Sequence, residues 1–113
     1  MVNYPVRDIS SQFSALGDPN RLAMVRQMSL GEVTVGDLAA NLKITMPATL
    51  KHLAILERAG VATSSKIGRE RKCRLEEIFL NDIDSWVTET RQAWNFRLDR
   101  LAALLEGSKE SNL

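Results

Sequence analysis

The sequence predicts a mainly α-helical protein with a small β-hairpin, arranged as a winged helix-turn-helix. Residues 34–60 read as two short helices joined by a tight turn, and a basic hairpin over residues 61–75 follows them directly. The expected order along the chain is four helices, two strands and a fifth, long helix. In a winged helix-turn-helix, the second helix of the pair enters the major groove of DNA. This order of elements therefore indicates double-stranded DNA as a partner.

The first helix is predicted over about residues 5–16, because apolar residues recur there at spacings of three and four. These residues are Val6, Ile9, Phe13 and Leu16. Gly17 ends this helix, and Asp18 and Pro19 then suit the N-cap and the first position of a second helix. Gly31 is predicted to end the second helix.

The helix-turn-helix pair is predicted from the residues at its helix ends. Thr34 and Thr45 suit the N-caps of the third and fourth helices, and Gly60 ends the fourth. The fourth helix, over about residues 46–59, is the predicted recognition helix, and its residues divide into two sides at about 100° per residue. The core side is expected to carry Leu50, Leu53, Leu56 and Glu57, with Met46 and Thr49 at its margin. The outward side is expected to carry Pro47, Ala48, Lys51, His52 and Ile55.

The wing is predicted over about residues 61–75, as two strands joined by Gly68-Arg69. The net charge of the chain is only +1, but the charge is segregated. Residues 43–74 contain eight basic residues and two acidic ones: Lys43, Lys51, Arg58, Lys66, Arg69, Arg71, Lys72 and Arg74 against Glu57 and Glu70. This segregation predicts one basic face that suits a polyanion. The alternative is an ordinary solvated strand edge, on which lysine also deters aggregation.

The last helix is predicted over about residues 77–106, followed by a flexible tail over residues 107–113. Its apolar stripe consists of Ile83, Val87, Thr90, Trp94, Leu98, Leu101 and Leu105. Exposed stripes of this length are uncommon on monomers, so a two-fold dimer is expected. The predicted dimer interface combines the first and last helices in Val6, Ile9, Phe13, Trp94, Leu98, Leu101 and Leu105.

The length of 113 residues predicts a single domain, over residues 1–106. No apolar run approaches the roughly 20 residues of a membrane span, and the N-terminus does not read as a secretion signal. The single cysteine, Cys73, excludes an internal disulfide and suits a reducing cytoplasm, which is the expected location. Neither a catalytic triad pattern nor a glycine-rich phosphate loop is recognisable, so an enzyme is not expected.

Several stretches together resemble the arsenic-repressor (ArsR/SmtB) family of winged-helix transcription regulators. They are residues 15–22 (ALGDPNRL), 35–39 (VGDLA), 47–53 (PATLKHL) and 56–60 (LERAG), with Gly68-Arg69 before Arg74-Leu75. The resemblance implies a homodimeric repressor that binds an inverted-repeat operator. It also implies DNA contacts at Thr45, Met46, Ala48, Thr49, Lys51 and His52, and it matches Arg21 to an arginine of the family's Asp-Pro-Thr-Arg stretch.

Among these residues, we expect base-edge contacts from Lys51, His52 and Thr49. Phosphate contacts are expected from Arg21, Lys66, Arg69 and Arg71. Because such contacts to the backbone carry little sequence information, the first group is expected to determine specificity.

The chain departs from the metal-sensing members of this family. Their Cys-Val-Cys-Asp-Leu element corresponds here to residues 34–38, which lack a thiol, and the last helix contains no histidine. Zinc and soft metals need several Cys or His ligands together, so no metal and no cofactor are expected. This pattern resembles a branch without metal sites. Two alternatives remain: a winged-helix module that binds protein, and a redox or metal sensor that uses Cys73 or His52. The sequence identifies no small-molecule effector.

Overall fold

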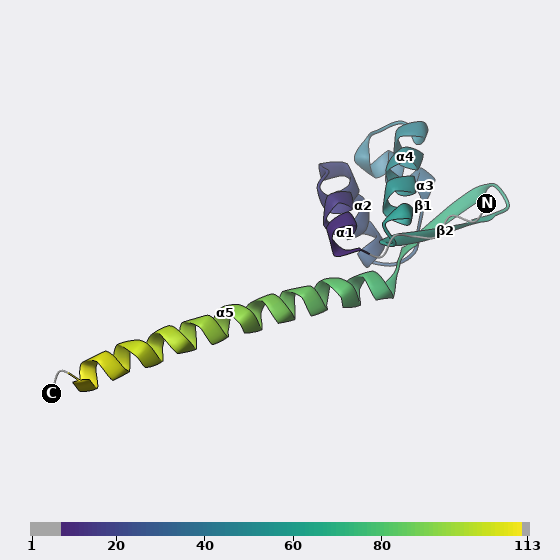
Figure 1. The fold of residues 1–113 in the computed structure, drawn as a ribbon. Helices are drawn as coiled ribbons and strands as arrows, with labels where there is room; N and C mark the ends of the chain where they lie inside the picture. Colours follow the sequence, from purple (N-terminus) through teal and green to yellow (C-terminus); the bar gives the residue numbers. More distant parts are fainter. Residues whose placement is uncertain (1–7, 112–113) are drawn as a thin grey trace. The chain divides into compact units, whose positions relative to one another are not determined.

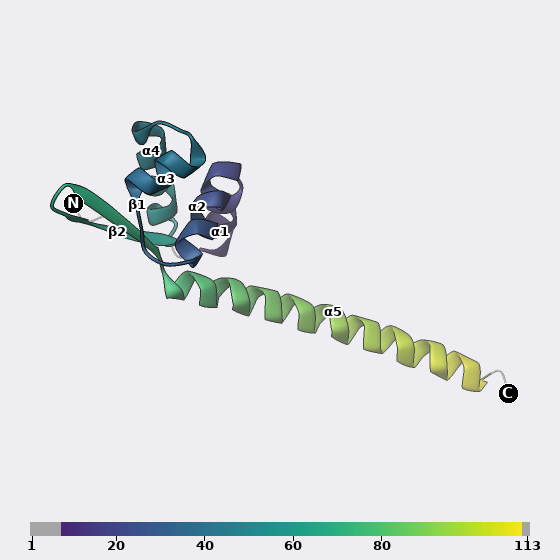
Figure 2. The ribbon, with the colours of Figure 1, turned by 180° about the vertical axis from the view of Figure 1, so that it is seen from behind.

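The computed structural model describes residues 8–111. The chain divides into two compact units, one that reaches to Asn81 and one that begins at Asp82. The first unit contains four helices and a three-stranded antiparallel sheet (Figures 1 and 2). A long helix, α5 (Glu77–Ser111), begins in the first unit and continues through the second. Among residues 8–111, no helix is both long and apolar enough to cross a membrane.

The C-terminal ends of the four helices in the first unit lie close to where the sequence predicts, but the first helix begins at Ile9, after its N-cap Asp8, and not at about residue 5. The four helices are α1 (Ile9–Leu16), α2 (Pro19–Ser29), α3 (Val35–Leu42) and α4 (Met46–Arg58). All three predicted caps are confirmed: the side chain of Asp18 accepts hydrogen bonds from two backbone N–H groups, and those of Thr34 and Thr45 accept one each. A threonine cap of this kind contributes about 1 kcal/mol to stability. The predicted residues 5–7, including Val6, lie outside the described part of the chain.

The sheet contains one strand that the sequence does not predict. Strands β2 (Ala62–Ile67) and β3 (Glu70–Leu75) form the expected hairpin, in which Lys66 pairs with Arg71 across the turn. The additional strand, β1 (Val33–Thr34), pairs with β3 and gives the order β1-β3-β2. Two residues are too few to show the alternation that identifies a strand. The hairpin projects from the helices as a wing (Figures 1 and 2).

The core of the first unit lies between the helices and the sheet. Its largest fully buried apolar residues are Met24, Leu38, Leu53, Leu56, Val61 and Cys73. The predicted core positions Leu53 and Leu56 are therefore confirmed. The prediction for Leu50 is wrong, because its side chain is 42% exposed. The buried residues of α4 are Thr49, Leu53 and Leu56, and this face leaves Leu50 at its edge.

Helix α5 is longer than the sequence predicts. It continues to Ser111, so the expected end at residue 106 is too early and the helix includes most of the predicted tail. Gly107 does not end the helix, since a glycine inside a helix costs only about 1 kcal/mol relative to alanine. Residues 112–113 lie outside the described part of the chain.

Candidate nucleic-acid interface

The outward face of α4 is the centre of the candidate interface. Thr45, Met46, Leu50 and Lys51 are exposed, and Ala48 is half-buried. Pro47, Ala54, Ile55 and Arg58 continue this face along the helix and are also exposed. The face combines small, apolar and cationic side chains. The small side chains allow a partner to approach closely, and the cations favour a partner that is anionic.

Thr49 does not belong to this face. Its side chain is completely buried, and its hydroxyl donates a hydrogen bond of 2.9 Å to the backbone carbonyl of Thr45. An oxygen without exposed surface cannot reach a base edge. The prediction that Thr49 contacts DNA is therefore wrong, and its hydroxyl instead helps to bury this side of α4 without an unpaired polar group.

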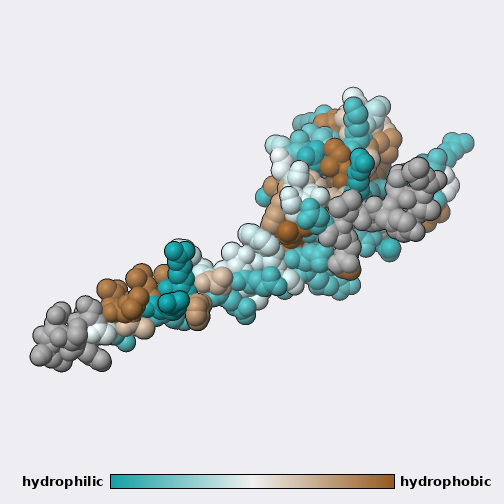
Figure 3. All heavy atoms as spheres, in the orientation of Figure 1, coloured by the Kyte–Doolittle hydropathy of each residue, from teal (hydrophilic) through white to brown (hydrophobic). Residues whose placement is uncertain are grey.

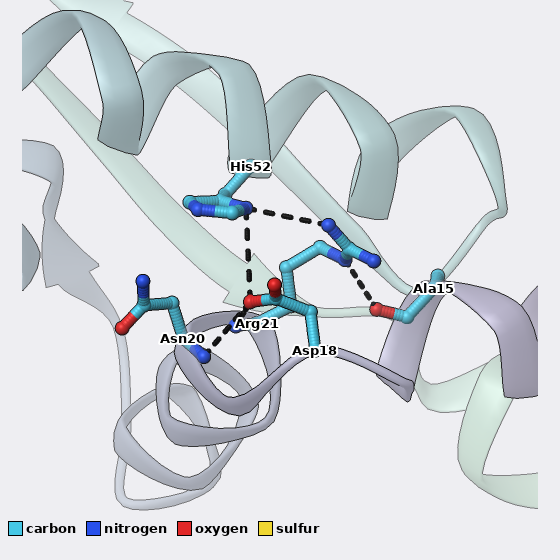
Figure 4. A network of polar contacts seen from close by, with 5 residues as sticks. All are labelled: Ala15, Asp18, Asn20, Arg21 and His52. Atoms are coloured by element: carbon cyan, nitrogen blue, oxygen red, sulfur yellow. Dashed lines mark hydrogen bonds and ion pairs between the residues drawn. The ribbon is translucent and has the colours of Figure 1, made fainter.

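His52 and Arg21 belong to a network that joins α4 to the start of α2 (Figure 4). His52 Nδ1 lies 3.4 Å from Arg21 Nη1 and 4.0 Å from Asp18 Oδ1, and the His52 side chain is only 20% exposed. Arg21 Nε also donates a 2.6 Å hydrogen bond to the carbonyl of Ala15, at the end of α1. These contacts connect three helices, so His52 and Arg21 have a structural role whether or not they also contact DNA.

Asp18 anchors this network through its charge. The backbone N–H groups of Arg21 and Asn20 and the nearby His52 and Arg21 side chains favour the carboxylate; they outweigh its partial desolvation and lower the pKa of Asp18 below its ordinary value. The sequence identifies Asp18 only as a cap. Its contact with His52 depends on how α2 and α4 pack together, which local spacing does not reveal.

The cations of the wing differ in their surroundings. Lys66 and Arg69 are exposed near its tip, as a phosphate contact requires. Arg71 is half-buried, and its Nη1 donates a 3.0 Å hydrogen bond to Ser64 Oγ, which in turn donates to Glu57 Oε1. This chain braces the wing against the second half of α4. Ser64 and Arg71 are diagonal neighbours across the hairpin, so the hairpin register was the signal that could have identified the pair.

A groove of about 570 Å³ is bordered by the first turn of α3, by the first half of α4 and by the tip of the wing. We call it the α4–wing groove. Met46 and Leu50 of α4 provide apolar lining, and three cations of the wing provide positive charge. Its complete lining is Thr34, Val35, Gly36, Asp37, Met46, Leu50, Lys66, Arg69, Glu70 and Arg71. The groove therefore brings the predicted recognition helix and the predicted wing contacts to one concave surface.

Cys73 is buried at the centre of the sheet, between the partners Val33 of β1 and Ser64 of β2. Burial raises the pKa of its thiol to about 11, and the charge of Glu57 acts in the same direction. Because the thiolate is the reactive form, this environment opposes the alternative in which Cys73 acts as a redox sensor. Within residues 8–111, no three His, Cys, Asp or Glu side chains are grouped to hold a metal ion.

The predicted dimer residues of α5 are all exposed. Trp94, Leu98, Leu101 and Leu105 leave an apolar stripe on this helix, and Figure 3 shows hydrophobic side chains gathered towards its C-terminal part. On α1, Phe13 is exposed and Ile9 is half-buried. The exposed stripe is what a second copy would have to cover.

Comparison with known proteins agrees with this geometry. Residues 18–64, from the α2 cap to the middle of β2, match the model of the bacterial regulatory protein, arsR family. A crystal structure of an ArsR family transcriptional regulator is 32% identical and superimposes with a TM-score of 0.73, over 77% of this chain and 96% of the other. The chain belongs to the ArsR family. The resemblance expected from the sequence is thus confirmed, together with the winged helix-turn-helix fold.

Two further relatives extend the comparison. An ArsR-like transcriptional regulator from Rhodococcus sp. RHA1 is 27% identical, with a TM-score of 0.77 over 88% of this chain and 91% of the other. The transcriptional repressor SdpR of Bacillus subtilis (strain 168) is 29% identical over 79 residues, or 70% of this chain and 88% of the relative. The likeness therefore covers most of the length of these relatives.

Proposed function

We propose that this ArsR-family chain is a homodimeric transcriptional repressor that binds an inverted-repeat DNA operator in the cytoplasm. The observation that supports it is the α4–wing groove, in which an exposed helix face lies beside three cations. The names of its relatives as transcriptional regulators and repressors support the same function. In this proposal, α4 enters a major groove and the wing lies against the flanking backbone.

The individual roles follow from exposure and charge. Lys51 is an exposed cation in the first half of α4, and we assign it to a base edge, with Thr45, Met46 and Ala48 beside it. Lys66 and Arg69 contact phosphates from the exposed end of the wing. Arg71 positions the wing through Ser64 and Glu57, and Arg21 and His52 position α4 on α2. Any DNA contact of these last three residues would be made by nitrogen atoms outside the bonds described above.

The dimer supplies the symmetry of the operator. We assign its interface to Ile9, Phe13, Trp94, Leu98, Leu101 and Leu105, with Val6 outside the described residues. Two copies related by a two-fold axis present two α4 helices, which suits half-sites about one helical turn or slightly more apart.

The decisive experiment selects bound sequences from a random DNA pool and then measures affinity by fluorescence anisotropy. A palindromic consensus supports the proposal. Lys51→Ala is expected to weaken binding to that sequence by about 1–3 kcal/mol while random DNA changes little. If Lys51 contacts only phosphate, both DNAs lose affinity alike and the salt slope falls by about one. A pool that yields no consensus, with weak sequence-blind binding, contradicts the proposal and favours a protein-binding module.

A further inference from the structure

We propose that Leu50 and Met46 read thymine C5-methyl groups in the major groove, so that each operator half-site carries thymines opposite these two side chains. This inference rests on the proposed DNA-binding function and adds the base specificity of the same surface. Leu50 and Met46 are two large apolar side chains on a face that is proposed to meet an anionic partner.

Both side chains are exposed on the surface of α4. Met46 is 47% exposed and Leu50 is 42% exposed. They lie four residues apart, so they share one side of α4. The core of the first unit does not need them, because Leu53 and Leu56 fill the buried side of the same helix. Their apolar surface therefore remains available to a ligand.

The groove that these two side chains line also contains charged residues. Lys66, Arg69 and Arg71 line the same groove as the two apolar side chains, together with the acids Asp37 and Glu70. Cations exceed acids by one there, and Lys51 adds another exposed cation on α4. A ligand that complements this surface combines negative charge with an apolar group within reach of α4. A strand of duplex DNA does both.

Thymine is the base whose edge suits an apolar side chain. In the major groove, the C5-methyl of thymine is the apolar group that base edges present, and the other edges present hydrogen-bond donors and acceptors. A leucine or methionine placed on those polar edges would remove water without replacing its hydrogen bonds, which is unfavourable. The same side chains gain by burying a methyl group. Leu50 and Met46 therefore favour thymine and disfavour G·C pairs at the positions they cover.

The test removes the methyl groups and nothing else. The operator obtained by selection is synthesised with each thymine replaced, one at a time, by deoxyuridine, and affinities are measured for the wild type and for Leu50→Ala. The wild type is expected to lose about fourfold in affinity for each methyl group that it buries. Leu50→Ala is expected to lose a similar factor on the unmodified operator and to become insensitive to the same replacement.

Two controls separate this inference from folding and from the proposed function. Leu30→Ala changes a leucine that is 90% exposed outside α4, and it should leave methyl sensitivity intact. A repeat selection with Leu50→Gln should shift the consensus from thymine towards adenine, because glutamine pairs with adenine edges. Specific binding by the wild type that ignores every deoxyuridine replacement overturns the methyl readout while the repressor assignment stands. Binding without any sequence preference overturns both.

Discussion

Cys73 illustrates how burial decides the chemistry of a single side chain. It lies in a cation-rich strand, where nearby positive charge would normally increase thiol reactivity. The structure places it in the core, and burial outweighs the charge of Arg71, which alone would lower its pKa. The thiol is therefore a small apolar core group in this fold.

The first prediction concerns the reactivity of this thiol. At about pH 8, the folded protein should react with iodoacetamide about 100-fold more slowly than the urea-unfolded chain. The reason is that each unit by which the pKa is raised lowers the fraction of thiolate about tenfold. Mass spectrometry of timed samples measures both rates. Equal rates in the folded and unfolded protein would contradict the buried position.

The same thiol predicts a loss of stability in alkali. The ordinary pKa of 9.0 applies to the unfolded chain, and the folded value is about 11. Between these values the unfolded chain releases the proton while the folded chain keeps it, so the free energy of unfolding falls as pH rises. Urea titrations across this range should show a steeper fall for the wild type than for Cys73→Ala.

Asp18 predicts the opposite response in acid. Its pKa is lowered in the folded protein, chiefly by the backbone N–H of Arg21, from an ordinary value of 3.8. Its contribution is complete above that value and is lost as pH falls through the lower folded pKa. Asp18→Asn keeps a capping side chain without the charge. The stability difference between wild type and variant should therefore shrink as the solution is acidified, as thermal melts at a series of pH values would show.

Helix α4 depends on its own first turn as well as on its packing. Thr45 accepts a hydrogen bond from Ala48 N–H through its hydroxyl, and its carbonyl accepts from the Thr49 hydroxyl. Thr45→Ala should reduce the free energy of unfolding by about 1 kcal/mol, and Thr45→Ser should restore most of it. Ser65→Ala, at an exposed wing position, is the matched control and should change stability little. Equal stabilities of Thr45→Ala and the wild type would show that the cap is not needed.

The same helix shows how far sequence reasoning reaches. Its caps, its length and the burial of Leu53 and Leu56 follow from local rules that depend only on neighbouring residues. The burial of Thr49 and the exposure of Leu50 do not follow from these rules. Periodicity orders residues around a helix, but the direction that faces inward is set by packing against other elements. A threonine also tolerates burial when its hydroxyl bonds to the preceding turn.

At the candidate nucleic-acid interface, the sequence identifies the cations of the wing but does not distinguish their roles. Lys66 and Arg69 are exposed near the tip of the wing, whereas Arg71 and Arg21 donate hydrogen bonds to other elements. Those bonds join residues from different parts of the chain, such as Arg21 with His52. Only the three-dimensional arrangement therefore distinguishes a positioning cation from one that can contact phosphate.

The stability of the proposed dimer should depend on the apolar stripe of α5. If two copies cover this stripe, Leu98→Asp combined with Leu101→Asp places carboxylates in a buried apolar interface, which is strongly unfavourable. The dissociation constant of the dimer should then rise by more than about tenfold, as sedimentation equilibrium would measure. A dimer contacts both half-sites at once, whereas a separated protomer contacts only one. Affinity for the full operator should therefore fall further than affinity for a single half-site. Ala103→Asp, an exposed position on the opposite side of the same helix, adds a charge without touching the stripe and should leave the dimer intact. A double variant that sediments as the wild-type dimer would place the interface elsewhere on the chain.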